Sequence, residues 1–233
     1  MTVGKKLTTF VITSILGLFS CNAFAQPIIE NYRNVTDARL TNPEESNWLS
    51  YRGNLEGWGY SPLGDITTAN VSELKPIWTF STGVLGGHES PPIVNNGVMF
   101  VTTPGNLLYA IDAASGDLLW RYQHDLPQTY IAFHRTNRGV ALYGDKVFMA
   151  TLDARVVALD AATGEKVWDT TVQDNSFGYY ITTAPLAIDG KIMVGTSGGE
   201  LGIRGFVVAL DSENGQEVWR TYTVPGPGEP GNE

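Results

Sequence analysis

The fold of this chain is decided by one stretch that occurs three times: AIDAASGDLLW at residues 110–120, ALDAATGEKVW at 158–168 and ALDSENGQEVW at 209–219. Corresponding residues lie 48 and then 51 positions apart. That period is typical of a four-stranded β-propeller blade rather than of a helical solenoid unit. The repeat therefore predicts an all-β chain built of propeller blades.

Each repeat reads as two strands joined by a tight turn. In the first copy, residues 107–111 and 117–122 are the predicted strands, and residues 112–116 are the turn. Asp112 can accept hydrogen bonds from the backbone ahead of it, and Gly116 can adopt a positive φ. Trp120, at the end of the repeat, is predicted to pack between neighbouring sheets rather than to take part in chemistry.

Further apolar strands are predicted upstream of each repeat, at residues 97–101, 146–150 and 191–195. Trp78 lies 42 residues before Trp120, so residues 76–80 are predicted to be the last strand of a blade whose other strands lie elsewhere. About three blades leave a propeller ring open with an exposed edge. We therefore expect residues 26–233 to be the N-terminal part of a propeller, ending in a loop at residues 225–233.

Composition supports a globular chain with an ordinary core. Hydrophobic residues make up 42% and charged residues 17%, and helical periodicity is missing. Loss of a leader that carries Lys5 and Lys6 and no acid would change the net charge from −9 to −11. This acidic balance argues against nucleic acid as a partner and favours solubility.

The first 25 residues have the pattern of a secretory signal peptide. Lys5 and Lys6 precede an apolar run at residues 7–19, and the tripeptide 23–25 is typical of a cleavage site. The run is shorter than a membrane span needs, so we expect no membrane span after cleavage and a periplasmic protein. Lipid attachment at Cys21, the single cysteine, is the alternative; either way the mature domain has no disulfide.

An insertion interrupts the third repeat at residues 195–205. Gly198 and Gly199 let a ligand approach the backbone closely, Ser197 can donate a hydrogen bond, and Glu200 offers a hard oxygen ligand for a cation. A purely structural glycine-rich turn is the alternative interpretation.

Three more polar residues precede predicted strands near the propeller axis, where ligands bind: Glu89, Arg138 and Thr182. Arg138 could hold a carboxylate with two hydrogen bonds, and Thr182 could add one more. Taken singly, Arg138 and Thr182 fit a surface or turn role better than a binding role, and Glu89 alone is ambiguous. The histidines have no zinc-ligand spacing, and no phosphate-binding or dinucleotide fingerprint occurs.

Together these features resemble the quinoprotein alcohol dehydrogenases that depend on pyrroloquinoline quinone (PQQ), including the methanol and ethanol dehydrogenases. The resemblance runs from about Asn47 to the end of the chain. Its marks are WLSYRG at 48–53, YSPL at 60–63, ESPP at 89–92, NRGVA at 137–141 and, most specifically, SGGELGIRG at 197–205.

The resemblance implies an eight-bladed propeller and a set of site residues. PQQ would be bound by six residues, namely Glu89, Arg138, Thr182, Ser197, Gly198 and Gly199. Glu200 would bind Ca²⁺ or a lanthanide ion. The implied reaction is oxidation of an alcohol by hydride transfer to the quinone, with electrons passed to a cytochrome c-type acceptor.

The chain also departs from the family pattern. Ala132 and Phe133 stand where the family usually has two adjacent cysteines, so either Phe133 covers the quinone by stacking or the site is altered. The family's aspartate base is expected beyond Glu233, which predicts that this chain alone is inactive. A sugar or polymer alcohol is an alternative substrate, and a non-catalytic scaffold of the outer-membrane assembly type is the alternative function, since the repeat alone does not separate the two.

Overall fold

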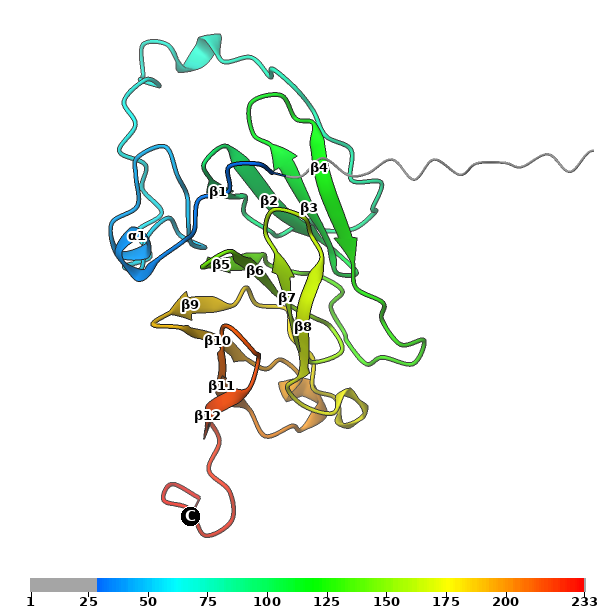
Figure 1. The fold of residues 1–233 in the computed structure, drawn as a ribbon. Helices are drawn as coiled ribbons and strands as arrows, with labels where there is room; N and C mark the ends of the chain where they lie inside the picture. Colours follow the sequence, from blue (N-terminus) through cyan, green and yellow to red (C-terminus); the bar gives the residue numbers. More distant parts are fainter. Residues whose placement is uncertain (1–28, 233) are drawn as a thin grey trace, which may run out of the picture.

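Each copy of the repeat lies in its own four-stranded antiparallel sheet, as the 48- and 51-residue spacings predict (Figure 1). The computed structural model describes residues 29–232. The first sheet comprises β1 (Ile93–Asn95), β2 (Val98–Thr103), β3 (Leu107–Asp112) and β4 (Leu118–Gln123). The second comprises β5 (Val140–Tyr143), β6 (Lys146–Ala150), β7 (Arg155–Asp160) and β8 (Lys166–Thr171). The third comprises β9 (Leu186–Ile188), β10 (Lys191–Gly195), β11 (Phe206–Asp211) and β12 (Glu217–Tyr222).

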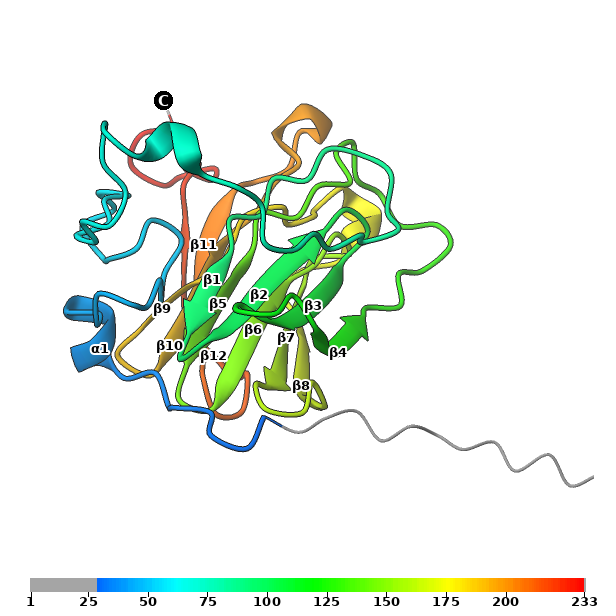
Figure 2. The same ribbon diagram turned by 90° about the horizontal axis from the view of Figure 1, so that it is seen from above.

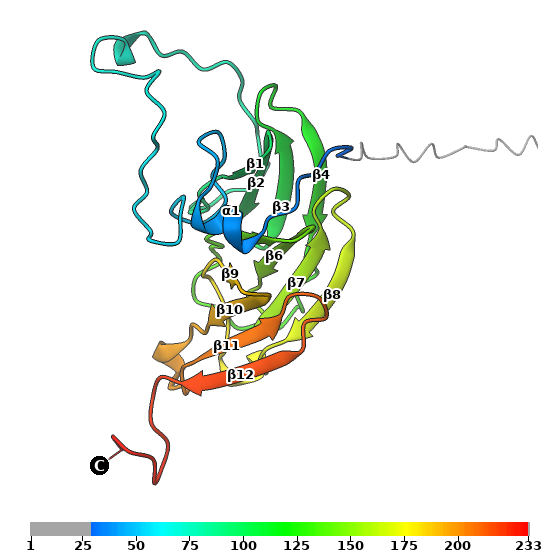
Figure 3. The same ribbon diagram turned by 60° about the vertical axis from the view of Figure 1, so that its left-hand side comes forward.

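The sheets follow one another along an arc, with β4, β8 and β12 on its outer side (Figure 3). Within each sheet the strands pair in the order of the sequence. The rest of the described chain adds one short helix, α1 (Asp37–Thr41), and three single 3₁₀ turns, η1 (Val71–Glu73), η2 (Asn175–Phe177) and η3 (Gly199–Leu201). This is the all-β propeller architecture that the sequence predicts, and the described residues form three of its blades.

The turn inside each repeat forms through the predicted side chains. Asp112 Oδ1 accepts hydrogen bonds from the amides of Ala114 at 2.9 Å and Ser115 at 2.8 Å. Gly116 then adopts a φ of +80°, which side chains disfavour. Asp160 and Asp211 repeat the arrangement in the second and third blades. The strand pair around the turn is irregular at the same point in each blade, where the register shifts after the alanine of the motif.

Each repeat tryptophan that has a following blade packs against the turn of that blade. Trp120 is fully buried, and its indole Nε1 donates to the carbonyl of Ala161 at 3.1 Å. Its ring lies so close to Gly164 that a Cβ there would approach the ring atoms to 2.7 Å. The same pairing joins Trp78 to Gly116 and Trp168 to Gly215. The prediction that Trp120 is a packing residue is confirmed.

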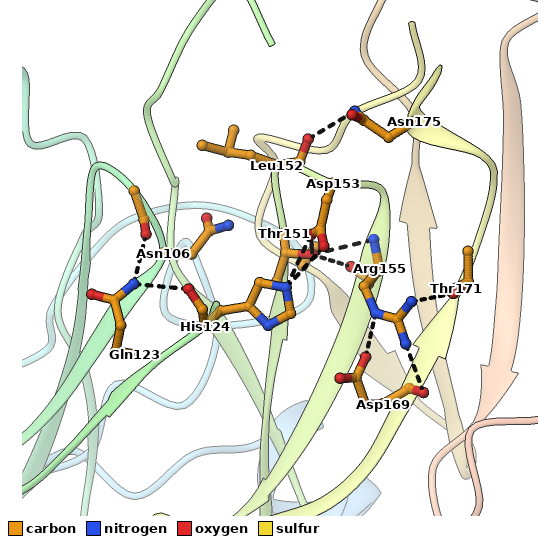
Figure 4. A network of polar contacts seen from close by, with 12 residues as sticks. Asn106, Gln123, His124, Thr151, Leu152, Asp153, Arg155, Asp169, Thr171 and Asn175 are labelled. Atoms are coloured by element: carbon orange, nitrogen blue, oxygen red, sulfur yellow. Dashed lines mark hydrogen bonds and ion pairs between the residues drawn. The ribbon is translucent and has the colours of Figure 1, made fainter. Parts of the chain in front are cut away.

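A buried hydrogen bond between a histidine and an aspartate adds a polar contact between the first two blades. His124, which follows β4, faces Asp153 in the β6–β7 turn, with Nε2 at 3.0 Å from Oδ2 (Figure 4). Burial raises the pKa of Asp153, but hydrogen bonds from His124 and from Thr151 outweigh it and leave that pKa below its ordinary value. The carboxylate is therefore charged at neutral pH and joins the two blades.

The predicted strand at residues 76–80 needs partner strands from outside the described residues, so it stays a prediction. These residues form no strand, because among residues 29–232 no segment pairs with their backbone. Ile77 is 84% exposed, as expected for a segment that no sheet covers. The tryptophan is held by its contact with Gly116 and by the hydrogen bond from its indole Nε1 to the carbonyl of Ala113 at 3.2 Å.

The segment before β1 runs along the side of the molecule where β1, β5 and β9 lie (Figure 2). Val35 pairs with Gly144 in the β5–β6 turn, and Trp48 pairs with Val94 of β1. Asp37 accepts hydrogen bonds from the Tyr143 hydroxyl and from the amide of Asp189 in the third blade, both at 2.7 Å. One segment therefore contacts all three blades.

Arg39 fixes this segment to the first blade. Its buried guanidinium bonds both oxygens of Glu44 and, at 3.0 Å, Oδ1 of Asn95 in β1. The hydrogen bond from Arg39, opposed by some burial, lowers the pKa of Glu44 from its ordinary 4.5 to about 2. Glu44 thus stays ionised well into the acid range.

Within residues 29–232, no helix is both long and apolar enough to cross a membrane. The predicted signal peptide at residues 1–25, and the alternative of lipid attachment at Cys21, lie outside the described residues.

Replacing Gly164 by alanine is expected to destabilise the protein more than replacing Gly190. Both glycines have positive φ, +75° and +67°, so each alanine costs about 1–2 kcal/mol of backbone strain. Only at Gly164 would the new Cβ meet a tryptophan, which adds about 1–3 kcal/mol, since nothing lies within 4 Å at Gly190. Thermal or urea unfolding of both variants measures the difference; equal losses would contradict the stacking role of Trp120.

Glu44→Gln is expected to weaken the response of stability to acid. Because the pKa of Glu44 is lower in the folded state, its ion pair stabilises the fold above pH 4.5 and is lost as the pH falls toward about 2. The variant should have a lower thermal midpoint than wild type at pH 7 and a shallower fall below pH 4.5. Glu45→Gln, at the adjacent exposed position, is the control and should behave as wild type.

Candidate functional site

Three polar residues of the site occupy equivalent places in successive blades. Glu89 lies shortly before β1, Arg138 before β5 and Thr182 before β9. These loops enter the first strand of each blade, and the strands β5 and β9 lie against each other. The blade repeat therefore places the three residues at the same end of successive blades, before the first strand of each.

The side chains form one connected polar chain. Arg138 Nη2 lies 2.9 Å from Oε2 of Glu89, and Nη1 donates to Oγ1 of Thr182 at 2.7 Å. Thr182 Oγ1 lies 3.3 Å from Oγ of Ser197. The structure thus brings together four of the seven residues that the sequence singled out, in the order Glu89, Arg138, Thr182, Ser197.

The polar chain is buried at Thr182 and exposed at Arg138 and Glu89. Thr182 is 5% exposed, whereas the side chains of Arg138 and Glu89 are 37% and 46% exposed. The backbone amide of Arg138 also donates to the carbonyl of Thr182 at 3.0 Å. The guanidinium is therefore held in place by its neighbours while much of its surface faces solvent, which suits the binding of an anionic group.

The glycine-rich insertion contains Ser197 and pairs with the backbone of Tyr180. The backbones of Ser197 and Tyr180 exchange hydrogen bonds at 2.7 and 3.3 Å. Gly198 has a φ of +119°, and a Cβ there would lie 2.2 Å from the carbonyl oxygen of Gly178. Gly199 is exposed, with nothing within 4 Å of a built Cβ. Gly198 is thus required for packing, and Gly199 presents bare backbone to the outside.

Glu200 lies in the same insertion, next to Gly199. It is exposed and lies in η3. Burial and then the negative charge of Glu200 raise the pKa of the Tyr180 phenol, while Arg138 lowers it. Glu200 and Arg138 therefore both act on one buried tyrosine. Among residues 29–232, no three side chains of the histidine, cysteine, aspartate and glutamate types come together as a metal site, so Glu200 could supply only part of one.

Phe133 lies close to this region as well. It is 58% exposed and lines a pocket of about 390 Å³ together with Glu89, Leu85 and Pro104. The aromatic side chain at this position therefore faces the same open space as one end of the polar chain.

Sequence reasoning missed the residues behind the polar chain. Asn137, Thr102 and Ser90 connect the loops of Arg138 and Glu89 by hydrogen bonds. Asn137 is adjacent to Arg138 in the Asn-Arg-Gly motif, but nothing in the motif alone says which of its residues faces the interior. Tyr180 was also missed, since its place depends on the pairing with Ser197.

Comparisons with known proteins agree with this architecture. The family model for the glucose/ethanol/alcohol dehydrogenase β-propeller domain, named PQQ, matches residues 48–232. Quinohemoprotein alcohol dehydrogenase ADH-IIG of Pseudomonas putida is 38% identical over 226 residues, which cover 94% of this chain and 31% of that protein. The 1-butanol dehydrogenase (cytochrome c) of Thauera butanivorans is 40% identical over 187 residues, 78% of this chain and 27% of that protein.

A solved structure described as a europium-containing methanol dehydrogenase superposes with a TM-score of 0.78 at 38% identity. The match covers 83% of this chain and 34% of that one. The chain thus spans about a third of the length of the relatives it matches.

Gly198→Ala is expected to disturb the insertion, and Gly199→Ala is expected to leave it intact. The first adds a Cβ that collides with the Gly178 carbonyl; the second adds one in open space. Hydrogen exchange at the amide of Ser197, which bonds Tyr180 at 2.7 Å, should become faster only in Gly198→Ala. Equal exchange in both variants would show that Gly198 is not needed for packing.

Proposed function

Because this chain belongs to the β-propeller family of the glucose, ethanol and other alcohol dehydrogenases, we propose that the intact protein oxidises an alcohol with PQQ as its cofactor. The observation that carries the proposal is the chain of side chains from Glu89 through Arg138 and Thr182 to Ser197. A scaffold propeller needs no such open, aligned set of polar groups at the end of its blades.

The residues fit the chemistry of PQQ, which carries three carboxylates. Arg138 has five N–H donors, and its bonds to Glu89 and Thr182 leave others available for a carboxylate. The hydroxyls of Thr182 and Ser197 can donate further bonds to the same anion. Glu89 can accept a hydrogen bond from a ring N–H of the cofactor. These four residues therefore offer both the donors and the acceptor that a planar anionic quinone needs.

The positions of Gly198 and Gly199 support the same proposal. At Gly199 a side chain would occupy open space beside Ser197, so the glycine leaves room for a ligand to lie against the backbone. Gly198 holds the loop in place by packing against Gly178. We assign Gly198 and Gly199 to the cofactor site on this basis.

Glu200 is proposed as a ligand of a metal ion, Ca²⁺ or a lanthanide, that accompanies the quinone. Its exposed carboxylate is a hard oxygen ligand of the kind these ions prefer. The remaining ligands, and the aspartate base that the resemblance implies, would come from outside residues 29–232. When bound, the quinone supplies the oxidant for the alcohol, and the metal supplies Lewis acidity.

In the proposed reaction, the part of the chain described here has a binding role. Arg138, Thr182 and Ser197 would hold the cofactor by its anionic and carbonyl oxygens, and the apolar face of Phe133 would exclude water from one side of the site. We propose that the 233-residue chain is inactive alone.

A periplasmic location and a cytochrome c-type electron acceptor complete the proposal. The basic and apolar pattern of residues 1–25 supports export. The relative from Thauera butanivorans is named for cytochrome c, which supports an acceptor of that type. The acidic balance of the chain would favour association with a basic cytochrome.

Glu200→Gln is expected to lower metal-dependent alcohol oxidation by about 10-fold to 100-fold or more. The intact apo-protein is reconstituted with PQQ and Ca²⁺ or La³⁺, and alcohol-dependent dye reduction is followed. Glu165→Gln, at an exposed turn of the second blade, is the control and should match wild type. A folded wild-type protein that neither binds PQQ nor reduces the dye would contradict the proposal and favour the scaffold.

A further inference from the structure

Asn137 is an almost fully buried side chain, 1% exposed, directly before Arg138. A buried primary amide has two N–H donors and one carbonyl oxygen to satisfy. All are used: Nδ2 donates to the Ala150 carbonyl at 2.9 Å and to Asn106 Oδ1 at 3.2 Å, while Oδ1 accepts from Gly139 N at 3.0 Å and from Thr102 Oγ1 at 2.9 Å. Such a fully bonded amide in the interior fixes the backbone around it.

The bonds of Asn137 bracket the arginine. The bond from Gly139 N to Asn137 Oδ1 closes a turn across Arg138, in the manner of an Asx-turn. Gly139 has a φ of +114° there. The amide of Arg138 is meanwhile bonded to the carbonyl of Thr182. The Cα–Cβ direction of Arg138 is therefore set by bonds on both sides, before any ligand binds.

The same network reaches the loop of Glu89. Thr102 of β2 donates its hydroxyl to Asn137, and its backbone amide donates to Ser90 Oγ at 3.1 Å. Ser90 directly follows Glu89. One residue of the first blade thus connects the loop that carries Glu89 with the loop that carries Arg138. The 2.9 Å contact between those two charged groups rests on this connection.

Asn137 also joins the two blades. Asn106 lies in the β2–β3 turn of the first blade, and Ala150 is the last residue of β6 in the second. The amide is bonded to both, so its position follows the relative placement of the blades. A change in the relative position of the two blades would therefore move Asn137 and, with it, Arg138.

We propose that Asn137 is a positioning residue of the cofactor site, which holds Arg138 and, through Thr102 and Ser90, Glu89 in the arrangement that binds PQQ. This inference rests on the proposed function. Asn137 itself is too deeply buried to touch the cofactor. Its effect is preorganisation: the two charged groups need no ordering when the ligand arrives, and that lowers the cost of binding.

The test compares Asn137→Ala with Asn95→Ala in the intact protein. Asn95 is a matched control, since it is equally buried, lies at the end of β1 that is further from Glu89, and bonds Arg39 and the carbonyl of Arg33 at 3.0 and 2.7 Å. Both variants should lose comparable thermal stability. Equilibrium dialysis at saturating Ca²⁺ measures the dissociation constant of PQQ. We expect Asn137→Ala to weaken PQQ binding about 10-fold to 100-fold, and Asn95→Ala to change it less than about 2-fold.

Thr102→Val serves as a second, milder variant, and it decides the test if Asn137→Ala does not fold. It preserves the shape of the side chain and the backbone bond to Ser90 but removes the hydroxyl bonded to Asn137. The positioning role is supported if PQQ binds more weakly while the KM for the alcohol, measured by dye reduction with PQQ-loaded protein, is unchanged. PQQ affinity equal to wild type in the folded variants overturns it, as does an equal loss in Asn95→Ala. Wild-type protein that binds no PQQ overturns the proposed function as well, so the two failures are distinguishable.

Discussion

A tryptophan ring stacked on a glycine holds each blade of this structure against the next. Trp78 on Gly116, Trp120 on Gly164 and Trp168 on Gly215 are three copies of one contact, each completed by a bond from the indole to a backbone carbonyl. The contact requires that the turn carry no side chain, and the turn requires a positive φ, so one residue type meets two independent demands. Two of the contacts join consecutive blades, and the third joins residues 76–80 to the first blade.

The repetition of the blades brings the residues of the site together. A residue just before the first strand of a blade returns, one blade later, to a neighbouring place at the same end. Glu89, Arg138 and Thr182 use this relation, and the side chains meet at 2.9 and 2.7 Å although they are far apart in the sequence. The third blade adds Ser197 by a different route, through an insertion between β10 and β11 that folds back on Tyr180. The site is thus partly a product of the repeat and partly a departure from it.

The features that sequence predicts best are those that depend on short-range geometry. The Asp112-to-Gly116 turn and the packing of Trp120 follow from residue chemistry within one repeat, and both occur as predicted. Residues 76–80 form no strand within residues 29–232, because a strand needs a partner and local preference cannot supply one. The inner strands β1 and β9, each three residues long, are too short to have a periodic pattern. The family resemblance predicts the site residues but not the network of Asn137, because the partners of a buried amide depend on how both blades are placed.

The segment from Val35 to Trp48 reaches the turns of all three blades, and this has a consequence for the order of folding. Asp37 and its hydrogen-bond partner Asp189 are separated by 152 residues of sequence. Its other contact, Tyr143, is 106 residues away. The pairing of Trp48 with Val94 needs only the first blade, whereas the two hydrogen bonds to Asp37 need the second and third blades. These contacts are non-local, and non-local contacts of this kind slow the folding of all-β proteins.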